Sequence, residues 1–299
     1  MKLHKLERFI VYPFLVGLLV LFAFYDLPIM QNLYDPTNVF GRLGENVSEI
    51  PLHLLGVYAS FLLFKTRNKA VKWKNILFGI IYIVLAVFFA GYGGALIRDY
   101  TKAATYGFPG WLPWVLAVVV GLGYFGLGFF AAWKTPITKR ENVMAWALFV
   151  VIIYAAMFVT MNVFKFLWHR PRWRYLVTLE GDPASMFVPV YHLGMTGGFS
   201  NNYASFPSGH TMNALALIVF SLFGYVDEKF ESSAFLIRLF AYIWAVLCAI
   251  SRIIMGAHFA SDVTAGFLLG FLVYDLMSAF LFPALLNKFQ KTQPLSEEK

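Results

Sequence analysis

Three separated groups of polar residues could together hold a phosphate group and attack it. Each group lies where a long apolar segment starts or stops. In chain order they are Lys165 with residues 170–172 (Arg-Pro-Arg), residues 205–211 (Ser-Phe-Pro-Ser-Gly-His-Thr), and residues 251–252 (Ser-Arg) with His258 and Asp262. Cations bind phosphate oxygens, and an imidazole can attack phosphorus or transfer a proton. These residue types therefore favour phosphoryl-transfer chemistry.

His258 and Asp262 are four residues apart, so they share a face if the segment is helical. A carboxylate bonded to one imidazole nitrogen would fix the tautomer and leave the other nitrogen free to attack. A structural pair at a helix end is the alternative interpretation of the same spacing.

The run Pro-Ser-Gly-His at residues 207–210 precedes an apolar segment. Proline and glycine shape a turn, and the free amides at a helix start can bind an anion. Ser208 could add a hydroxyl, and His210 is placed to protonate a leaving oxygen. A capped helix start, with Ser208 as the cap, is the alternative.

Three cations, Lys165, Arg172 and Arg252, are expected to bind phosphate oxygens, Arg as a fork and Lys as a point charge. Their alternative role is to reach from the end of a span to the membrane surface. For Arg170 and Arg174 we favour this alternative. No metal is expected, because the groups are rich in cations whereas Mg²⁺ needs converging oxygen ligands.

The composition is that of a membrane protein. Of the 299 residues, 60% are hydrophobic and only 13% are charged, whereas about a quarter of an ordinary soluble domain is charged. The apolar runs are long and continuous, which favours helices over the alternating strands of a barrel. The net charge of +8 comes mostly from short loops beside these runs, so nucleic acid is not an expected partner.

About 20 apolar residues cross a bilayer core as a helix. On that basis we predict an all-α polytopic bundle of about eight transmembrane helices. They lie near residues 9–25, 50–64, 76–97, 111–133, 143–164, 211–226, 236–254 and 259–283. Asp275, inside the last of them, is expected to make a polar contact between helices.

Loop charges predict the orientation of these helices. Basic residues gather at 2–8, 65–74 and 134–140, which the positive-inside rule places in the cytoplasm. The acidic loop 26–49 is expected on the opposite face; it carries Asp26, Asp35, Glu45 and Glu49. With eight spans both termini are cytoplasmic, and all three polar groups fall on the extracytoplasmic face.

The three groups resemble the signature of the type-2 phosphatidic acid phosphatase superfamily, in its integral-membrane branch. The family pattern is Lys-x6-Arg-Pro, then Pro-Ser-Gly-His, then Ser-Arg-x5-His-x3-Asp. Lys165 and Arg172 keep the first spacing, with Trp173 in place of the proline, and the other two patterns are complete. The resemblance covers roughly residues 140–283. It implies an N-terminal helix pair (1–75), a six-helix phosphatase-like core (76–287) and a cytoplasmic tail (288–299).

The resemblance implies hydrolysis without a metal or cofactor. His258 would be the nucleophile that forms a phosphohistidine, Asp262 would orient it, and His210 would be the general acid and then the base. The residues implied to bind the phosphoryl group are Lys165, Arg172, Ser208, Gly209 and Arg252. Phosphoryl transfer depends mainly on positioning and charge stabilisation, which agrees with this set of residues.

The expected substrate is a lipid phosphomonoester or diphosphate, of the phosphatidate, phosphatidylglycerol phosphate or polyprenyl diphosphate type. A lipid phosphotransferase would use the same residues, and a lipid transporter or scaffold with an inactive site is a further alternative. Membrane lipids are expected partners, and no obligate protein partner is expected. One cysteine and no evident organelle signal favour a bacterial plasma membrane.

Overall fold

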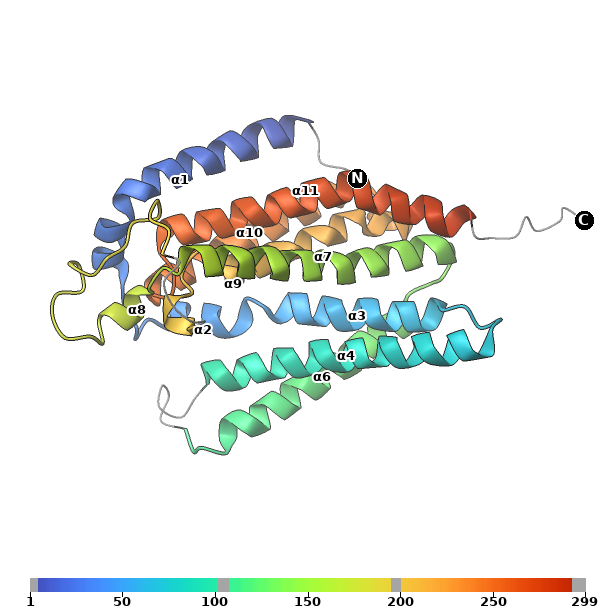
Figure 1. The fold of residues 1–299 in the computed structure, drawn as a ribbon. Helices are drawn as coiled ribbons and strands as arrows, with labels where there is room; N and C mark the ends of the chain where they lie inside the picture. Colours follow the sequence, from blue (N-terminus) through green and yellow to red (C-terminus); the bar gives the residue numbers. More distant parts are fainter. Residues whose placement is uncertain (1–4, 102–107, 195–199, 292–299) are drawn as a thin grey trace, which may run out of the picture.

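The computed structural model describes residues 5–101, 108–194 and 200–291, and this part of the chain contains helices and no strand. The helices lie side by side in one bundle (Figure 1). The long helices are α1 (Lys5–Leu33), α3 (Ile50–Thr66), α4 (Lys72–Tyr100), α6 (Leu112–Lys134), α7 (Arg140–Trp168), α10 (Ala234–Ile254) and α11 (Ala260–Lys291). The predicted all-α polytopic bundle is confirmed.

Seven helical segments within the described ranges are long and apolar enough to cross a membrane. The remaining predicted span, at 211–226, is shorter. There α9 (Gly209–Leu215) continues directly into the 3₁₀ helix η2 (Ala216–Tyr225). Many large apolar side chains point away from the bundle, such as Phe9 and Phe280, which are 77% and 74% exposed. An apolar outer surface is what a lipid environment requires.

The acidic loop expected at 26–49 is largely helical, which corrects the prediction, and its acidic residues Asp26, Glu45 and Glu49 are buried. Helix α1 continues to Leu33, and a short helix, α2 (Val39–Val47), follows. The Asn38 side chain caps α2 by accepting a hydrogen bond from the Gly41 amide at 3.0 Å. Helix α2 lies directly on α10, because a Cβ added at Gly44 would come within 2.3 Å of the Ser251 side chain.

The helices of residues 1–75 pack against different parts of the bundle. Helix α1 lies along α11, whereas α3 packs against α4, α6 and α7. Together α2 and α3 form the most buried of the candidate spans. The division of the chain at residue 75 stays a prediction, and most of the predicted tail, residues 292–299, lies outside the described residues.

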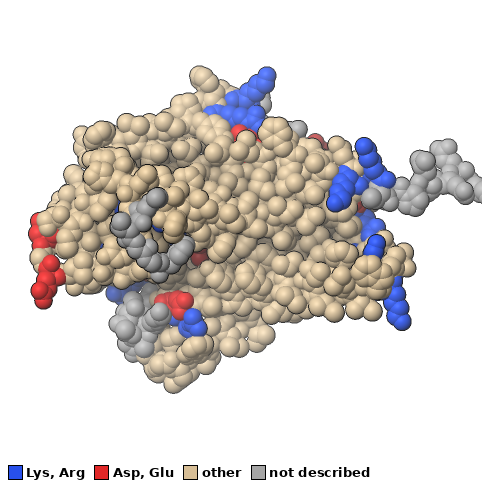
Figure 2. All heavy atoms as spheres, viewed as in Figure 1, with Lys and Arg blue, Asp and Glu red and all other residues tan. Residues whose placement is uncertain are grey.

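Polar contacts also hold helices together at the end of the bundle away from the three polar groups. Asp275 of α11 accepts hydrogen bonds from Arg8 at 2.7 Å and Tyr12 at 3.0 Å, which confirms its predicted role between helices. Figure 2 shows Lys and Arg side chains protruding near the end of α11, and acidic side chains protruding at the opposite end of the molecule.

Candidate active site

Backbone hydrogen bonds join the three polar groups to one another. Helix α7 ends at Trp168, and the left-handed backbone of the next residue, His169 (φ 44°), turns the chain away from the helix axis. The chain then pairs with the second group, since the Ser205 amide donates to the Arg170 carbonyl at 3.0 Å. The second group reaches the third through the Ser208 amide, which donates to the Asp262 carbonyl at 2.9 Å. The groups therefore form one compact site at the ends of α7, α9 and α11.

His258 has one nitrogen fixed and the other free of protein hydrogen bonds. Its Nδ1 lies 2.5 Å from the Ser205 carbonyl oxygen. A carbonyl can only accept, so Nδ1 is the donor and carries the proton. No hydrogen bond from the described residues engages Nε2, which leaves its lone pair available. Burial lowers the pKa of His258 well below its usual value, and the nearby charges of Arg172 and Arg252 reinforce this effect.

Asp262 does not contact His258 in the way that the spacing predicted. Its carboxylate accepts from the Arg170 guanidinium at 2.6 Å, from the Ser205 hydroxyl at 2.6 Å and from the Phe259 amide at 2.8 Å. The link to the imidazole is therefore indirect, because Asp262 holds Ser205, whose carbonyl holds His258. The backbone carbonyl of Ser205, rather than the expected carboxylate of Asp262, therefore fixes the tautomer of His258.

Arg170 is fully buried, so the membrane-surface role that the sequence favoured for it is wrong. Its guanidinium bridges two carboxylates, Asp262 at 2.6 Å and Asp26 of α1 at 2.8 Å. Asp26 also accepts from the amide and hydroxyl of Ser261. A buried cation between two buried carboxylates makes this cluster a rigid support beneath Asp262.

Arg252 and Arg172 carry buried donors that have no partner among the described residues. Arg252 is fully buried, and within this part of the chain its Nε and Nη1 lack a hydrogen-bond partner, as does Nε of Arg172. Burial and the charges of Arg174 and Arg252 lower the pKa of Arg172 to about 9. These guanidinium groups repel one another and have unpaired donors. A bound anion would accept hydrogen bonds from the donors and balance the charge.

Glu45 of α2 supplies part of the negative charge that these arginines need. One of its oxygens accepts from Arg252 at 2.7 Å and from Arg174 at 2.8 Å. Arg174 is therefore also part of the site, rather than a cation that only reaches the membrane surface. The Glu45 carboxylate leaves the Nε and Nη1 edge of Arg252 unoccupied.

The remaining phosphate-binding candidates lie together. Gly209 packs closely on α7, because a Cβ there would lie 2.2 Å from the Met161 sulfur and 3.5 Å from Lys165 Nζ. Ser208 caps α9, since its hydroxyl accepts from the Thr211 amide at 3.3 Å. Trp173, which replaces the proline of the family pattern, packs in a buried cluster with Met30 and Phe259.

His210 faces His258 across the site, with ring centroids 6.4 Å apart. Its Nε2 lies 2.7 Å from the hydroxyl of Tyr100, the last residue of α4. The nearest carboxylate oxygen is Oε2 of Glu49, at 3.9 Å. Asn213 holds the other oxygen of Glu49 through a hydrogen bond of 2.6 Å.

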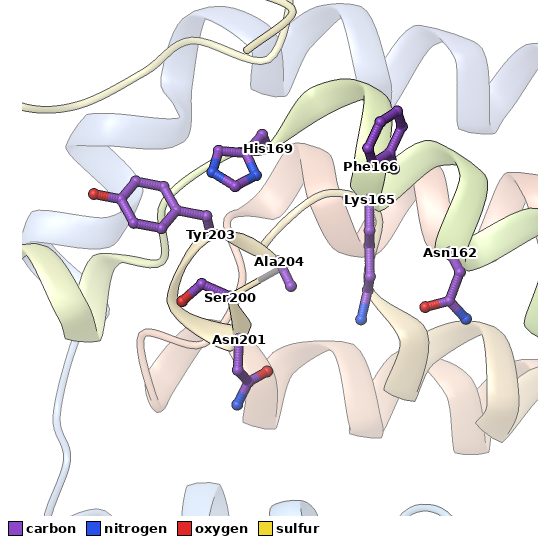
Figure 3. Close-up of a pocket in the computed structure, with 8 residues that line it drawn as sticks. All are labelled: Asn162, Lys165, Phe166, His169, Ser200, Asn201, Tyr203 and Ala204. Carbon is purple, nitrogen blue, oxygen red and sulfur yellow. The ribbon is translucent and has the colours of Figure 1, made fainter. Parts of the chain in front are cut away.

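Two cavities meet at Lys165. The larger, of about 470 Å³, is lined by the charged residues Glu45, Glu49, Asp99, Lys165, Arg172 and Arg174 together with His210. The smaller, of about 220 Å³, lies between the end of α7 and residues 200–204. Figure 3 shows Lys165 extending from α7 into this second cavity, beside Asn162 and near Asn201. Within the described residues, no group of three or more His, Cys, Asp or Glu side chains is arranged to hold a metal.

The sequence reading missed four residues that approach the motif residues. They are Asp26, Glu45, Glu49 and Tyr100, and the three acidic ones are buried. In the sequence, the charges of Asp26, Glu45 and Glu49 served only to predict on which side of the membrane the segment 26–49 lies. The overlooked indication was charge balance, since five cations (Lys165, Arg170, Arg172, Arg174 and Arg252) were predicted on the same membrane face as the acidic segment 26–49.

The family comparison agrees with the location of the site. A model of the PAP2 superfamily matches residues 144–284. Over 98 residues, 31% of this chain, the sequence is 39% identical to a Bacillus subtilis (strain 168) protein named phosphatidylglycerophosphatase B, and the match covers 43% of that protein. No solved structure is significantly similar to the chain. Residues 144–284, which contain all three polar groups, are therefore a PAP2 superfamily domain.

Proposed function

We propose that this chain is a membrane lipid phosphatase, which hydrolyses a lipid phosphomonoester or diphosphate through a phosphohistidine intermediate. The observation that carries the proposal is a pair of imidazoles, with ring centroids 6.4 Å apart, beside buried arginine donors. Among the described residues, Nε2 of His258 and two donors of Arg252 have no hydrogen-bond partner. A phosphoryl group placed there would satisfy these donors and expose phosphorus to the imidazole.

The reaction has two balanced steps. In the first, Nε2 of His258 forms a bond to phosphorus while the bond from phosphorus to the lipid oxygen breaks, and His210 gives that oxygen a proton. In the second, His210 takes a proton from water, whose oxygen attacks phosphorus. The nitrogen–phosphorus bond then breaks, and inorganic phosphate leaves. Lys165, Arg172 and Arg252 would stabilise the charge on the phosphoryl oxygens in both steps.

The lipid nature of the substrate is supported by the fold and by the comparisons. The site lies at the end of a bundle whose outer surface is apolar, so phosphate can enter from the interface while the tails stay in lipid. The Bacillus subtilis relative is named as a phosphatidylglycerophosphatase. From the basic loops we propose a plasma membrane location with the site on the extracytoplasmic face.

The test is a panel of lipid phosphates in detergent, with EDTA present, on purified wild-type protein and His258→Ala. We expect the wild-type protein to release phosphate from at least one lipid and His258→Ala to release none while staying folded. Brief reaction with a labelled substrate should give acid-labile label on wild-type protein only. Transfer of phosphate to an added lipid would indicate a phosphotransferase. Lipid binding without any turnover by the wild-type protein would indicate a transporter or scaffold.

A further inference from the structure

Glu49 lies outside the PAP2 superfamily domain, yet its carboxylate borders the proposed acid of the reaction. It precedes α3 and is buried, with 8% of the residue exposed. Asn213 of α9 holds one of its oxygens, and the other lies 3.9 Å from Nε2 of His210. Glu49 also lines the cavity of about 470 Å³ that contains the phosphate-binding cations.

The position of Glu49 differs from that of Glu45 in one decisive respect. Glu45 is engaged by Arg252 and Arg174, so two cations already balance its charge. The Glu49 carboxylate accepts a hydrogen bond from a neutral amide, and no described Lys or Arg lies within salt-bridge distance of it. The cation that faces it is His210 in its acid form, at 3.9 Å, and this positive charge is lost when His210 protonates the leaving oxygen. The Glu49 charge then acts on the leaving group beside His210.

The reaction geometry identifies what lies there. His258 and His210 face each other across the site, so the attacked phosphorus lies between them and the leaving oxygen lies on the His210 side. A proton donor must come within about 3 Å of the oxygen that it protonates. Nε2 of His210 lies 2.7 Å from the Tyr100 hydroxyl and 3.9 Å from Glu49. A leaving oxygen that takes the place of that hydroxyl at Nε2 therefore lies beside Glu49.

The chemistry of the leaving group now distinguishes two substrate classes. The leaving group of a lipid phosphomonoester is a neutral alcohol, which can donate a hydrogen bond to a neighbouring carboxylate. The leaving group of a lipid diphosphate is the lipid monophosphate, which carries negative charge. Its close contact with a carboxylate is strongly unfavourable. We propose, resting on the proposed function, that Glu49 makes this site selective for lipid phosphomonoesters over lipid diphosphates.

The experiment compares dodecyl monophosphate with dodecyl diphosphate, which have the same tail and differ in the leaving group. It measures kcat/KM with EDTA present for wild-type protein, Glu49→Gln and Glu49→Asp. The wild-type protein should prefer the monophosphate. Glu49→Gln keeps an oxygen for Asn213 but removes the charge, so it should raise relative use of the diphosphate on the order of ten-fold or more. Glu49→Asp keeps the charge and should keep the preference.

A matched control removes the same charge far from the site. Glu228 is exposed and pairs with Lys139, at the end of α7 opposite Lys165, so Glu228→Gln should leave the preference unchanged. An equal loss on both substrates in Glu49→Gln, or a wild-type protein without preference, overturns the inference. If Glu49→Gln fails to fold, a Glu49→Asp protein that has lost the preference overturns it as well. A wild-type protein that hydrolyses neither compound nor any lipid phosphate refutes the proposed function instead.

Discussion

At the scale of single residues, the site is defined by how each imidazole is held. The Ser205 carbonyl fixes the proton of His258 on Nδ1, whereas His210 contacts a tyrosine hydroxyl and lies near a carboxylate. The hydrogen-bond partners differ, although burial and nearby cations lower the pKa of both imidazoles. Two predictions follow from the difference between the two environments.

The first concerns pH. Burial and nearby cations lower the pKa of His258, so the imidazole stays neutral as pH falls through the ordinary value of about 6.5. Protonation of His258 should therefore reduce kcat/KM only below about pH 6.5, and this fall is the acid limb of the pH profile. The measurement is a pH profile corrected for ionisation of the substrate. Arg172→Gln removes one of the cations, so its acid limb should move to higher pH, and an unmoved limb would contradict this assignment.

The second concerns the leaving group. His210→Ala should slow hydrolysis of an alkyl phosphate by about 10²–10⁴, since an alkoxide needs a proton to leave. An aryl phosphate with an acidic phenol leaves without that proton and should lose much less. The comparison needs kcat for both esters in wild-type and variant protein. Equal losses on the two esters would remove His210 from the role of acid.

At the scale of elements, α1 and α2 supply charges that the motif residues require. Asp26 of α1 pairs with the fully buried Arg170, and Glu45 of α2 pairs with the fully buried Arg252. The superfamily match begins at residue 144, so both carboxylates come from outside it. The stability of the site should therefore respond to changes in these two helices.

Removal of the Asp26 charge should destabilise the protein. Asp26→Asn leaves Arg170 with only one counter-ion in a buried site, and breaking a buried pair costs about 3–5 kcal/mol. We expect a lower Tm in detergent and reduced turnover. Asp35→Asn is the matched control, because Asp35 is partly exposed in the turn between α1 and α2 and its carboxylate accepts hydrogen bonds from the nearby Thr37. Equal Tm values for the two variants would show that the Asp26–Arg170 pair contributes little.

The close contact of α2 with α10 can be tested separately. Gly44→Ala would place a methyl group 2.3 Å from the Ser251 side chain, and such overpacking costs about 1–3 kcal/mol. Because Glu45 follows directly, its pairing with Arg252 should be disturbed and kcat/KM should fall. Gly91→Ala gains the same helix propensity in α4 but meets no atom within 4 Å. Loss of activity in both variants would indicate an effect of alanine itself.

The elements that sequence could predict were those with a local cause. Long apolar runs mark the transmembrane helices, and the motif residues lie where those runs end. Helix α2 could not be predicted this way, because nine residues with two glycines form a helix only when tertiary contacts hold them. The partner of Arg170 was equally hidden, since Asp26 is 144 residues away and no short pattern links the two.

At the scale of the whole molecule, the charge distribution predicts the orientation. From the basic loops we propose that residues 65–74 lie in the cytoplasm and the site on the opposite face. In a protein with Cys248 changed to Ala, Glu180→Cys should react with an impermeant thiol reagent in intact cells. Asn68→Cys should react only in opened membranes. Both positions are exposed. The reverse labelling pattern would place the site in the cytoplasm and leave the chemistry unaffected.

The pairing of Asp26 with Arg170 also has a consequence for the time course of biosynthesis. Asp26 emerges from the ribosome 144 residues before Arg170, which at about 5–20 residues per second is roughly 7–30 s. Glu45 can meet Arg174 after 129 residues but meets Arg252 only after 207. A nascent chain stopped before α10 therefore contains the Asp26–Arg170 and Glu45–Arg174 pairs, but it lacks Arg252 and Asp262, the second partners of Glu45 and Arg170. We expect an added protease to digest such a chain faster than the full-length protein.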